Sequence, residues 1–185
     1  GKSTLLLEGD MRRPKISEIF KLHDIKGLSD VLIGTVSVEN AICTSADLLM
    51  SGIDWDKFVG TSGIDNLHVL PAGTIPPNPS ELLLSNDFRR LIENIRTKYD
   101  FIIIDTPPTL PVSDASIIGT VSDGTVLIYE SDKTSRHLLL RAIQTLHKNK
   151  VKIFGIVINQ LEYDVVIKSS RYGYEYYSKS SRSED

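Results

Sequence analysis

The chain has 185 residues, 41% of them hydrophobic and 24% charged, which suits one globular domain with a sizeable core. A formal net charge of −3 and the lack of a long basic run in the sequence argue against nucleic acid as a partner. The single cysteine, Cys43, excludes an intrachain disulfide, the four histidines lack metal-ligand spacing, and no apolar run approaches the ~20 residues that cross a bilayer.

The first residues, Gly-Lys-Ser-Thr, match the end of a phosphate-binding P-loop, but we do not interpret them as one. In a P-loop these residues begin a helix, whereas here Leu5 to Leu7 follow at once and indicate a strand. We therefore interpret Gly1 as the cap of a preceding helix. On this interpretation the first β-α unit of the fold lies upstream of the sequence.

The strand at Leu5 to Leu7 runs into a polar turn that carries Glu8, Asp10, Arg12 and Arg13. Such a turn is often only solvated. Further elements are then predicted in chain order: short helices over 16–22, 28–33 and 38–42, loop and short helix over 43–66, a strand over 67–70, a proline-rich loop over 71–79 with Ser80 as the next helix cap, and an amphipathic helix over 87–98.

The stretch Phe101 to Pro108, FIIIDTPP, predicts a strand buried on both faces that ends at Asp105. Ser113 or Asp114 is the expected cap of the following helix. A strand over 124–129, a helix over 135–148 and a strand over 152–159 complete the pattern. The last strand ends at Asn159, where an amide could contact a nucleotide base.

This alternation predicts an α/β fold with a doubly wound, mostly parallel sheet and helices on both faces. The carboxyl ends of parallel strands form one ligand-binding edge, so Asp105 and the acidic turn after Leu7 are expected to face one crevice. We assign this domain to residues 1–162. Residues 163–185 predict a flexible tail that carries four of the seven tyrosines: Tyr172, Tyr174, Tyr176 and Tyr177.

Together these segments resemble the cytoplasmic kinase domain of the bacterial tyrosine autokinases (BY-kinases) of capsule and exopolysaccharide synthesis. LLLEGDMRRP resembles the family's second nucleotide motif, Walker A′, and FIIIDTPP resembles its Walker B motif. PPNPSELL and the tyrosine-rich end also follow the family's style. The resemblance covers nearly the whole chain, and the order of the four motifs is more specific than any one of them.

The resemblance implies a P-loop NTPase fold that binds ATP with Mg²⁺ and phosphorylates tail tyrosines of a neighbouring subunit. Asp10 and Asp105 match the positions that organise Mg²⁺. Glu8 matches the proposed base, a position that is usually aspartate, and Arg12 matches a motif cation. The family also implies a ring-like homo-oligomer at the cytoplasmic side of the inner membrane, tethered by a polysaccharide copolymerase subunit or domain.

The family's Walker A loop and its ring-forming motif are not found in this sequence, so we expect residues 1–185 alone to bind ATP poorly and not to autophosphorylate. Two other functions fit the same residues. A deviant Walker ATPase of the chromosome-partitioning or division-site type would share the motifs without modifying tyrosine, although the tail lacks the apolar face of a membrane-targeting helix. A regulatory adaptor would use its tyrosines only for docking.

Overall fold

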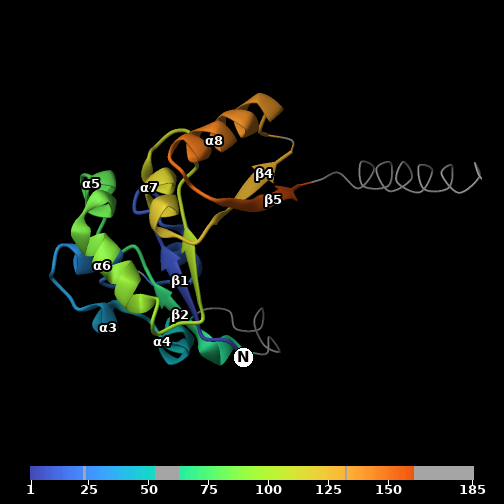
Figure 1. Ribbon diagram of the computed structural model, residues 1–185. Helices are drawn as coiled ribbons and strands as arrows, with labels where there is room; N and C mark the ends of the chain where they lie inside the picture. Colours follow the sequence, from blue (N-terminus) through green and yellow to red (C-terminus); the bar gives the residue numbers. More distant parts are fainter. Residues whose placement is uncertain (23, 53–62, 132, 161–185) are drawn as a thin grey trace, which may run out of the picture.

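The computed structural model describes residues 1–22, 24–52, 63–131 and 133–160 (Figure 1). Within these ranges every strand predicted from the sequence is present. In chain order the elements are β1 (Thr4–Glu8), α1 (Lys15–Ile19), α2 (Leu28–Leu32), α3 (Val38–Ala41), α4 (Ser45–Met50), the 3-10 helix η2 (Ile64–Asn66), β2 (Leu67–Leu70), α5 (Pro79–Leu84), α6 (Asn86–Ile95), β3 (Phe101–Asp105), α7 (Asp114–Val121), β4 (Thr125–Glu130), α8 (Arg136–Lys148) and β5 (Ile153–Asn159).

The strands form two parallel sheets. The first has the order β2-β1-β3, and the second pairs β4 with β5. Parallel pairing confirms the predicted α/β class. Instead of one continuous sheet, however, the described residues form two, with β3 at the edge of one and β4 at the edge of the other.

Helices cover both faces of the first sheet, because its central strand alternates its apolar side chains between them. Leu5 and Leu7 of β1 belong to the larger core, which includes residues of α2, α3, α5, α6 and α7. Leu6 points the other way, toward a smaller core built by α1, α4 and Val69 of β2. In the second sheet, Leu127 packs against α8, which lies over β4 and β5 in Figure 1.

The prediction that Phe101 to Asp105 is buried on both faces is wrong. The side chains of Phe101 and Ile103 are each 57% exposed, whereas Ile102 and Ile104 pack against the larger core. The helices α1 and α4 cover the opposite face only over β1 and β2. In the ranges that the structure describes, nothing comparable covers β3 on that side.

The first three residues confirm that Gly-Lys-Ser-Thr does not begin a helix. They precede β1, which starts at Thr4, and Asp100 fixes them. Its carboxylate accepts a hydrogen bond from the backbone N–H of Ser3 at 2.8 Å and pairs with the Lys2 ammonium at 3.2 Å. Lys2 therefore contacts the amino end of the sheet, away from the edge where Asp105 lies.

The predicted cap at Ser80 is wrong, and the predicted cap at Ser113 is confirmed in position only, whereas other helices are capped by a serine hydroxyl. The cap position of α5 is Asn78, and Ser80 lies inside the helix. Ser113 does precede α7, but its side chain makes no capping hydrogen bond. By contrast, the hydroxyls of Ser85 and Ser135 accept hydrogen bonds from the first turns of α6 and α8.

Candidate functional site

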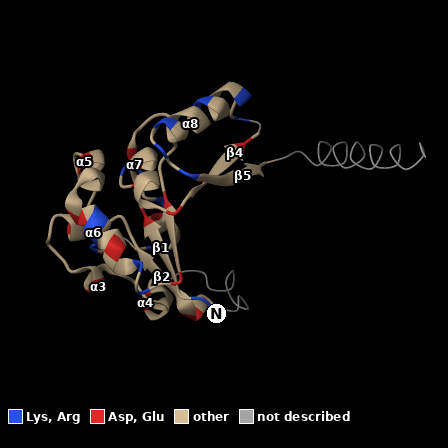
Figure 2. Ribbon diagram, viewed as in Figure 1, with Lys and Arg blue, Asp and Glu red and all other residues tan. Residues whose placement is uncertain are grey.

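The site is built where β1 and β3 end side by side. Glu8 lies opposite Asp105 in the parallel register, and the backbone N–H of Gly9 donates to the carbonyl oxygen of Asp105 at 2.8 Å. A Cβ atom at Gly9 would lie 2.7 Å from that oxygen and 2.8 Å from the Ile118 side chain. Only glycine lets the two strand ends approach this closely, and acidic residues gather here below α7 (Figure 2).

Asp10 and Asp105 carry the negative charge of this edge. Asp105 is exposed, yet its pKa is raised, first by partial burial of the carboxyl and then by the charges of Asp10 and Glu8. The turn after β1 orients Asp10, because its Oδ1 accepts hydrogen bonds from the backbone N–H groups of Arg12 and Arg13, both at 3.0 Å. The structure therefore brings together the two residues that were predicted to organise Mg²⁺.

Asp10 and Asp105 supply the oxygen ligands that Mg²⁺ prefers. Mg²⁺ is usually held by one or two carboxylates together with waters and phosphate oxygens rather than by a complete protein cage. The described ranges contain no group of three or more His, Cys, Asp or Glu side chains arranged to hold a metal ion. Asp10 and Asp105 would hold the ion, which would supply positive charge to the phosphates.

Glu8 is placed differently from what the sequence suggested. Its side chain is 0% exposed, and its oxygens accept hydrogen bonds from the backbone N–H groups of Ile16 at 2.6 Å, Ser17 at 3.1 Å and Ala72 at 3.0 Å. The Ser17 hydroxyl donates to it as well. Pro14, the cap residue of α1, has no side chain that can accept these bonds. Glu8 therefore caps α1 from the strand, an arrangement that does not favour the predicted role of base.

Arg12 also has a partner that the sequence did not reveal. Its guanidinium binds the fully buried carboxylate of Asp114, with Nε 2.8 Å from Oδ2 and Nη2 3.3 Å from Oδ1. The Ser80 hydroxyl joins both residues, accepting from Arg12 at 2.9 Å and donating to Asp114 at 2.5 Å. The sequence predicts only local helix caps at Asp114 and Ser80, and no sequence signal links them to Arg12, which lies 102 and 68 positions earlier.

The remaining predicted residues lie apart from this edge or outside the described ranges. Asn159 ends β5 opposite Glu130, and its Oδ1 accepts a hydrogen bond from the backbone N–H of Gln160 at 2.9 Å. It belongs to the second sheet, so it is not brought into contact with Asp10 or Asp105 through strand pairing. Four predicted residues lie outside the described part of the chain: Tyr172, Tyr174, Tyr176 and Tyr177.

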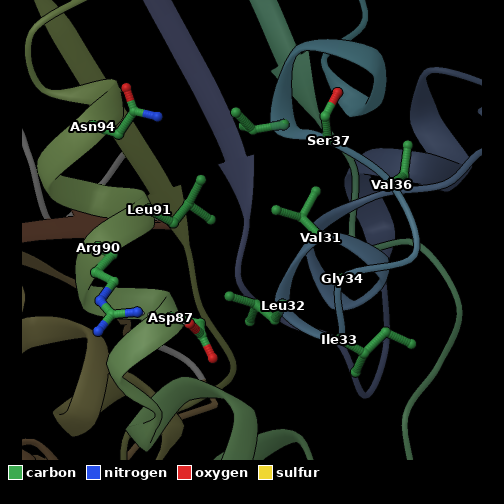
Figure 3. A pocket seen from close by; sticks show the side chains of 11 residues that line it. Val31, Leu32, Ile33, Gly34, Val36, Ser37, Asp87, Arg90, Leu91 and Asn94 are labelled. Atoms are coloured by element: carbon green, nitrogen blue, oxygen red, sulfur yellow. Dashed lines mark ion pairs between the residues drawn. The ribbon is translucent and has the colours of Figure 1, made fainter.

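A separate pocket of about 440 Å³ lies between α2, the turn that follows it, and α6 (Figure 3). Val31, Leu32 and Leu91 give it apolar walls, and Arg90 stands beside it. None of the residues predicted to bind the nucleotide or metal lines this pocket. It is therefore not part of the acidic edge.

Comparison with known proteins agrees with this geometry. The model of an AAA domain family (AAA_31) matches residues 20–156. The tyrosine-protein kinase YwqD of Bacillus subtilis is 36% identical over 94% of this chain and 65% of its own length. The putative tyrosine-protein kinase CapB of Staphylococcus aureus is 34% identical over 95% of this chain and 68% of its own. The chain thus spans about two thirds of the length of these curated relatives.

Solved structures separate the kinases from their more distant relatives. The crystal structure of the chimerical protein CapA2B2 is 30% identical, with a TM-score of 0.74 over 87% of this chain and 64% of that one. MinD of Pyrococcus horikoshii, complexed with Mg-ADP, reaches a TM-score of 0.62 at 21% identity over 85% of this chain and 58% of that one, which shows the shared P-loop NTPase fold alone. The chain therefore belongs to the bacterial tyrosine autokinases, or BY-kinases, within the P-loop NTPases.

Proposed function

We propose that this chain is the larger part of the catalytic domain of an ATP-dependent protein-tyrosine autokinase that acts in capsule or exopolysaccharide synthesis. The observation that carries the proposal is the position of Asp10 and Asp105 at the carboxyl edge of β1 and β3, close enough for the charge of Asp10 to raise the pKa of Asp105. This is the edge at which open parallel sheets bind ligands. The relatives named tyrosine-protein kinase supply the reaction class.

In the proposed reaction, the hydroxyl oxygen of a tyrosine attacks the γ-phosphorus of ATP. A new oxygen–phosphorus bond forms, the bond between the γ-phosphorus and the bridging oxygen breaks, and ADP leaves. Positioning and charge stabilisation dominate such transfers. Asp10 and Asp105 would hold Mg²⁺, which would neutralise phosphate charge when bound. The phenolic proton passes to a carboxylate oxygen of this pair rather than to Glu8, because Glu8 is buried and already accepts hydrogen bonds from backbone groups.

The proposed acceptors are the tail tyrosines Tyr172, Tyr174, Tyr176 and Tyr177 of a neighbouring subunit, which implies a homo-oligomer. We further propose that Asn159, at the carboxyl end of β5, contacts the adenine base. A membrane subunit or domain of the polysaccharide export machinery would hold the enzyme at the cytoplasmic face of the inner membrane. No helix in the described ranges is both long and apolar enough to span a bilayer.

The test uses the full-length protein with MgATP and mass spectrometry of phosphotyrosine. Wild type should modify the tail, and Asp105→Asn should reduce incorporation at least about 100-fold, the scale expected when a group that stabilises transition-state charge is removed. Asp123→Asn, which alters an exposed carboxylate after α7, is the matched control and should match wild type. ATP turnover with an unmodified tail would contradict the kinase proposal and favour a deviant Walker ATPase.

The same variant, Asp105→Asn, also distinguishes a regulatory adaptor from a kinase. If the tyrosines serve only for docking, Asp105→Asn should leave the phosphotyrosine level unchanged, because another enzyme would install it. Residues 1–185 alone are expected to bind ATP weakly. In the described ranges the acidic side of the site is present, but no glycine-rich loop opening a helix is available to hold the phosphates.

A further inference from the structure

The ion pair of Arg12, which is partly exposed, with the buried Asp114 joins three segments that are far apart in sequence. Arg12 comes from the turn after β1, Asp114 is the first residue of α7, and Ser80 belongs to α5. Two roughly parallel hydrogen bonds connect the guanidinium to the carboxylate, a geometry that restricts both distance and orientation. The pair therefore acts as a brace between the end of β1 and the start of α7.

The Asp114 carboxylate needs a partner because it is fully buried. Burial by itself would raise the pKa of Asp114, but the hydrogen bonds from Arg12 and Ser80 outweigh it and the pKa is lowered. The Asp114 carboxylate is therefore charged, and Arg12 is its cationic partner. Removing Arg12 would leave the buried Asp114 charge without its cationic partner, so Asp114 holds the Arg12 side chain against the start of α7.

The brace is continuous with the acidic edge. The backbone N–H of Arg12 donates to Asp10 while its side chain is held by Asp114. Asp105 lies at the end of β3, and the chain runs from there to α7, which Asp114 begins. Asp10 and Asp105 carry like charges that repel, so something must keep the turn after β1 from moving away from β3.

We propose that Asp114 is a positioning residue: by anchoring Arg12, it fixes the turn that orients Asp10 at the edge where Asp105 lies. This inference deepens the proposed function, on which its role in metal binding rests. It also gives Arg12 a different task from the one that its sequence motif suggested. Arg12 orients the carboxylates of the site through a structural contact instead of offering a free guanidinium to the phosphates.

The first experiment measures the brace itself, in the full-length protein without nucleotide. In Asp114→Asn, hydrogen exchange of the backbone amides of Arg12 and Arg13 should become at least tenfold faster, because the turn around Asp10 loses its anchor. Asp123→Asn, which removes the partner of Arg96 at an exposed ion pair, is the matched control and should leave these amides unchanged. Unchanged protection at Arg12 and Arg13 in a folded Asp114→Asn protein would overturn the proposal.

The second experiment measures the consequence for metal use. Asp114→Asn should raise the Mg²⁺ concentration for half-maximal phosphorylation about tenfold, while saturating Mg²⁺ restores kcat to within about threefold of wild type. Ser80→Ala removes one donor of the brace and should shift the Mg²⁺ dependence in the same direction by a smaller factor. A loss of kcat that Mg²⁺ does not restore would show a general packing role and would overturn the positioning role.

Combining variants tests whether the two residues act as a unit. Arg12→Ala, Asp114→Asn and the double variant should show similar Mg²⁺ dependence, because each breaks the same contact. If the double variant raised the required Mg²⁺ concentration by the product of the two single-variant factors, the two residues would act independently, which would contradict the brace. If wild-type protein forms no phosphotyrosine, the proposed function fails, and the hydrogen-exchange result still decides whether Asp114 fixes the turn.

Discussion

The carboxylate of Glu8 accepts a hydrogen bond from the backbone N–H of Ala72 at 3.0 Å, across 64 residues of sequence. The same carboxylate binds the backbone N–H groups of Ile16 and Ser17 at the start of α1. The hydrogen bonds of this one buried carboxylate thus connect the central strand to the first helix and to the segment after β2. Its position at the beginning of the acidic motif had suggested chemistry, but its contacts are those of a structural residue.

Glu8→Gln should therefore destabilise the full-length protein by about 3 kcal/mol. An amide has one acceptor oxygen, so at least one of the buried backbone donors loses its partner, which costs about 1 to 3 kcal/mol for each group. Urea denaturation of wild type and variant measures the loss. Glu93→Gln, at an exposed position of α6, is the control and should change stability by less than about 0.5 kcal/mol.

The same variant addresses the role of base. If Glu8 took the proton from tyrosine, Glu8→Gln would lose phosphorylation even at urea concentrations below its own unfolding midpoint. The expected result is that phosphorylation is retained below the lowered urea midpoint of the variant.

Asp105→Asn should stabilise the ligand-free protein at neutral pH although it abolishes phosphorylation. The folded-state pKa of Asp105 is raised by burial and by the neighbouring charges of Asp10 and Glu8, so folding favours the protonated form. The protonated Asp105 carboxyl therefore stabilises the folded state fully at pH values below the ordinary carboxyl pKa. This stabilisation is lost as the pH rises through the raised pKa of the folded protein. Thermal unfolding should give a higher midpoint for the variant at pH 7 and equal midpoints near pH 3. A lower midpoint at pH 7 would show that the carboxylate stabilises the fold.

The strands and most helices could be predicted because their signal is local. Apolar runs such as Leu5 to Leu7 and the helical spacing before β3 depend only on neighbouring residues. The contacts of Glu8 and Asp114 could not be predicted, because their partners lie 64 and 102 positions away and, for Glu8, are backbone groups that any residue carries. The exposure of Phe101 was missed for a related reason: a buried strand and a strand with one uncovered face share the same apolar sequence.

Asp30 should make the protein sensitive to acid. Burial alone would raise the pKa of this carboxyl, which is 1% exposed, but hydrogen bonds from Thr74, Lys26 and Gly27 hold it at about 2. A lowered folded-state pKa contributes stability above the ordinary carboxyl pKa, and this stability is lost as pH falls from about 4 to 2. The contribution is at most about 2.5 kcal/mol. Asp30→Asn should flatten the fall of stability across this range.

Urea midpoints measured from pH 5 to pH 2.5 provide the check for Asp30. Asp65→Asn, at an exposed carboxylate, is the matched control and should keep the slope of wild type. An Asp30→Asn protein whose stability still falls as steeply as that of wild type would show that the acid sensitivity arises elsewhere.

Gly9→Ala should separate the ends of β1 and β3 and so weaken both the fold and the site. The added Cβ would lie 2.7 Å from the carbonyl oxygen of Asp105, a backbone atom that cannot rotate away. Overpacking of this kind costs about 1 to 3 kcal/mol, and the bond from the Gly9 N–H to Asp105 would lengthen. Gly155→Ala is the control, because a Cβ there meets no atom within 4 Å. Urea denaturation should show the loss only for Gly9→Ala, together with a higher Mg²⁺ requirement for phosphorylation. Equal stability of the two variants would mean that the strand ends tolerate separation and that the close approach at Gly9 is not needed to hold Asp10 near Asp105.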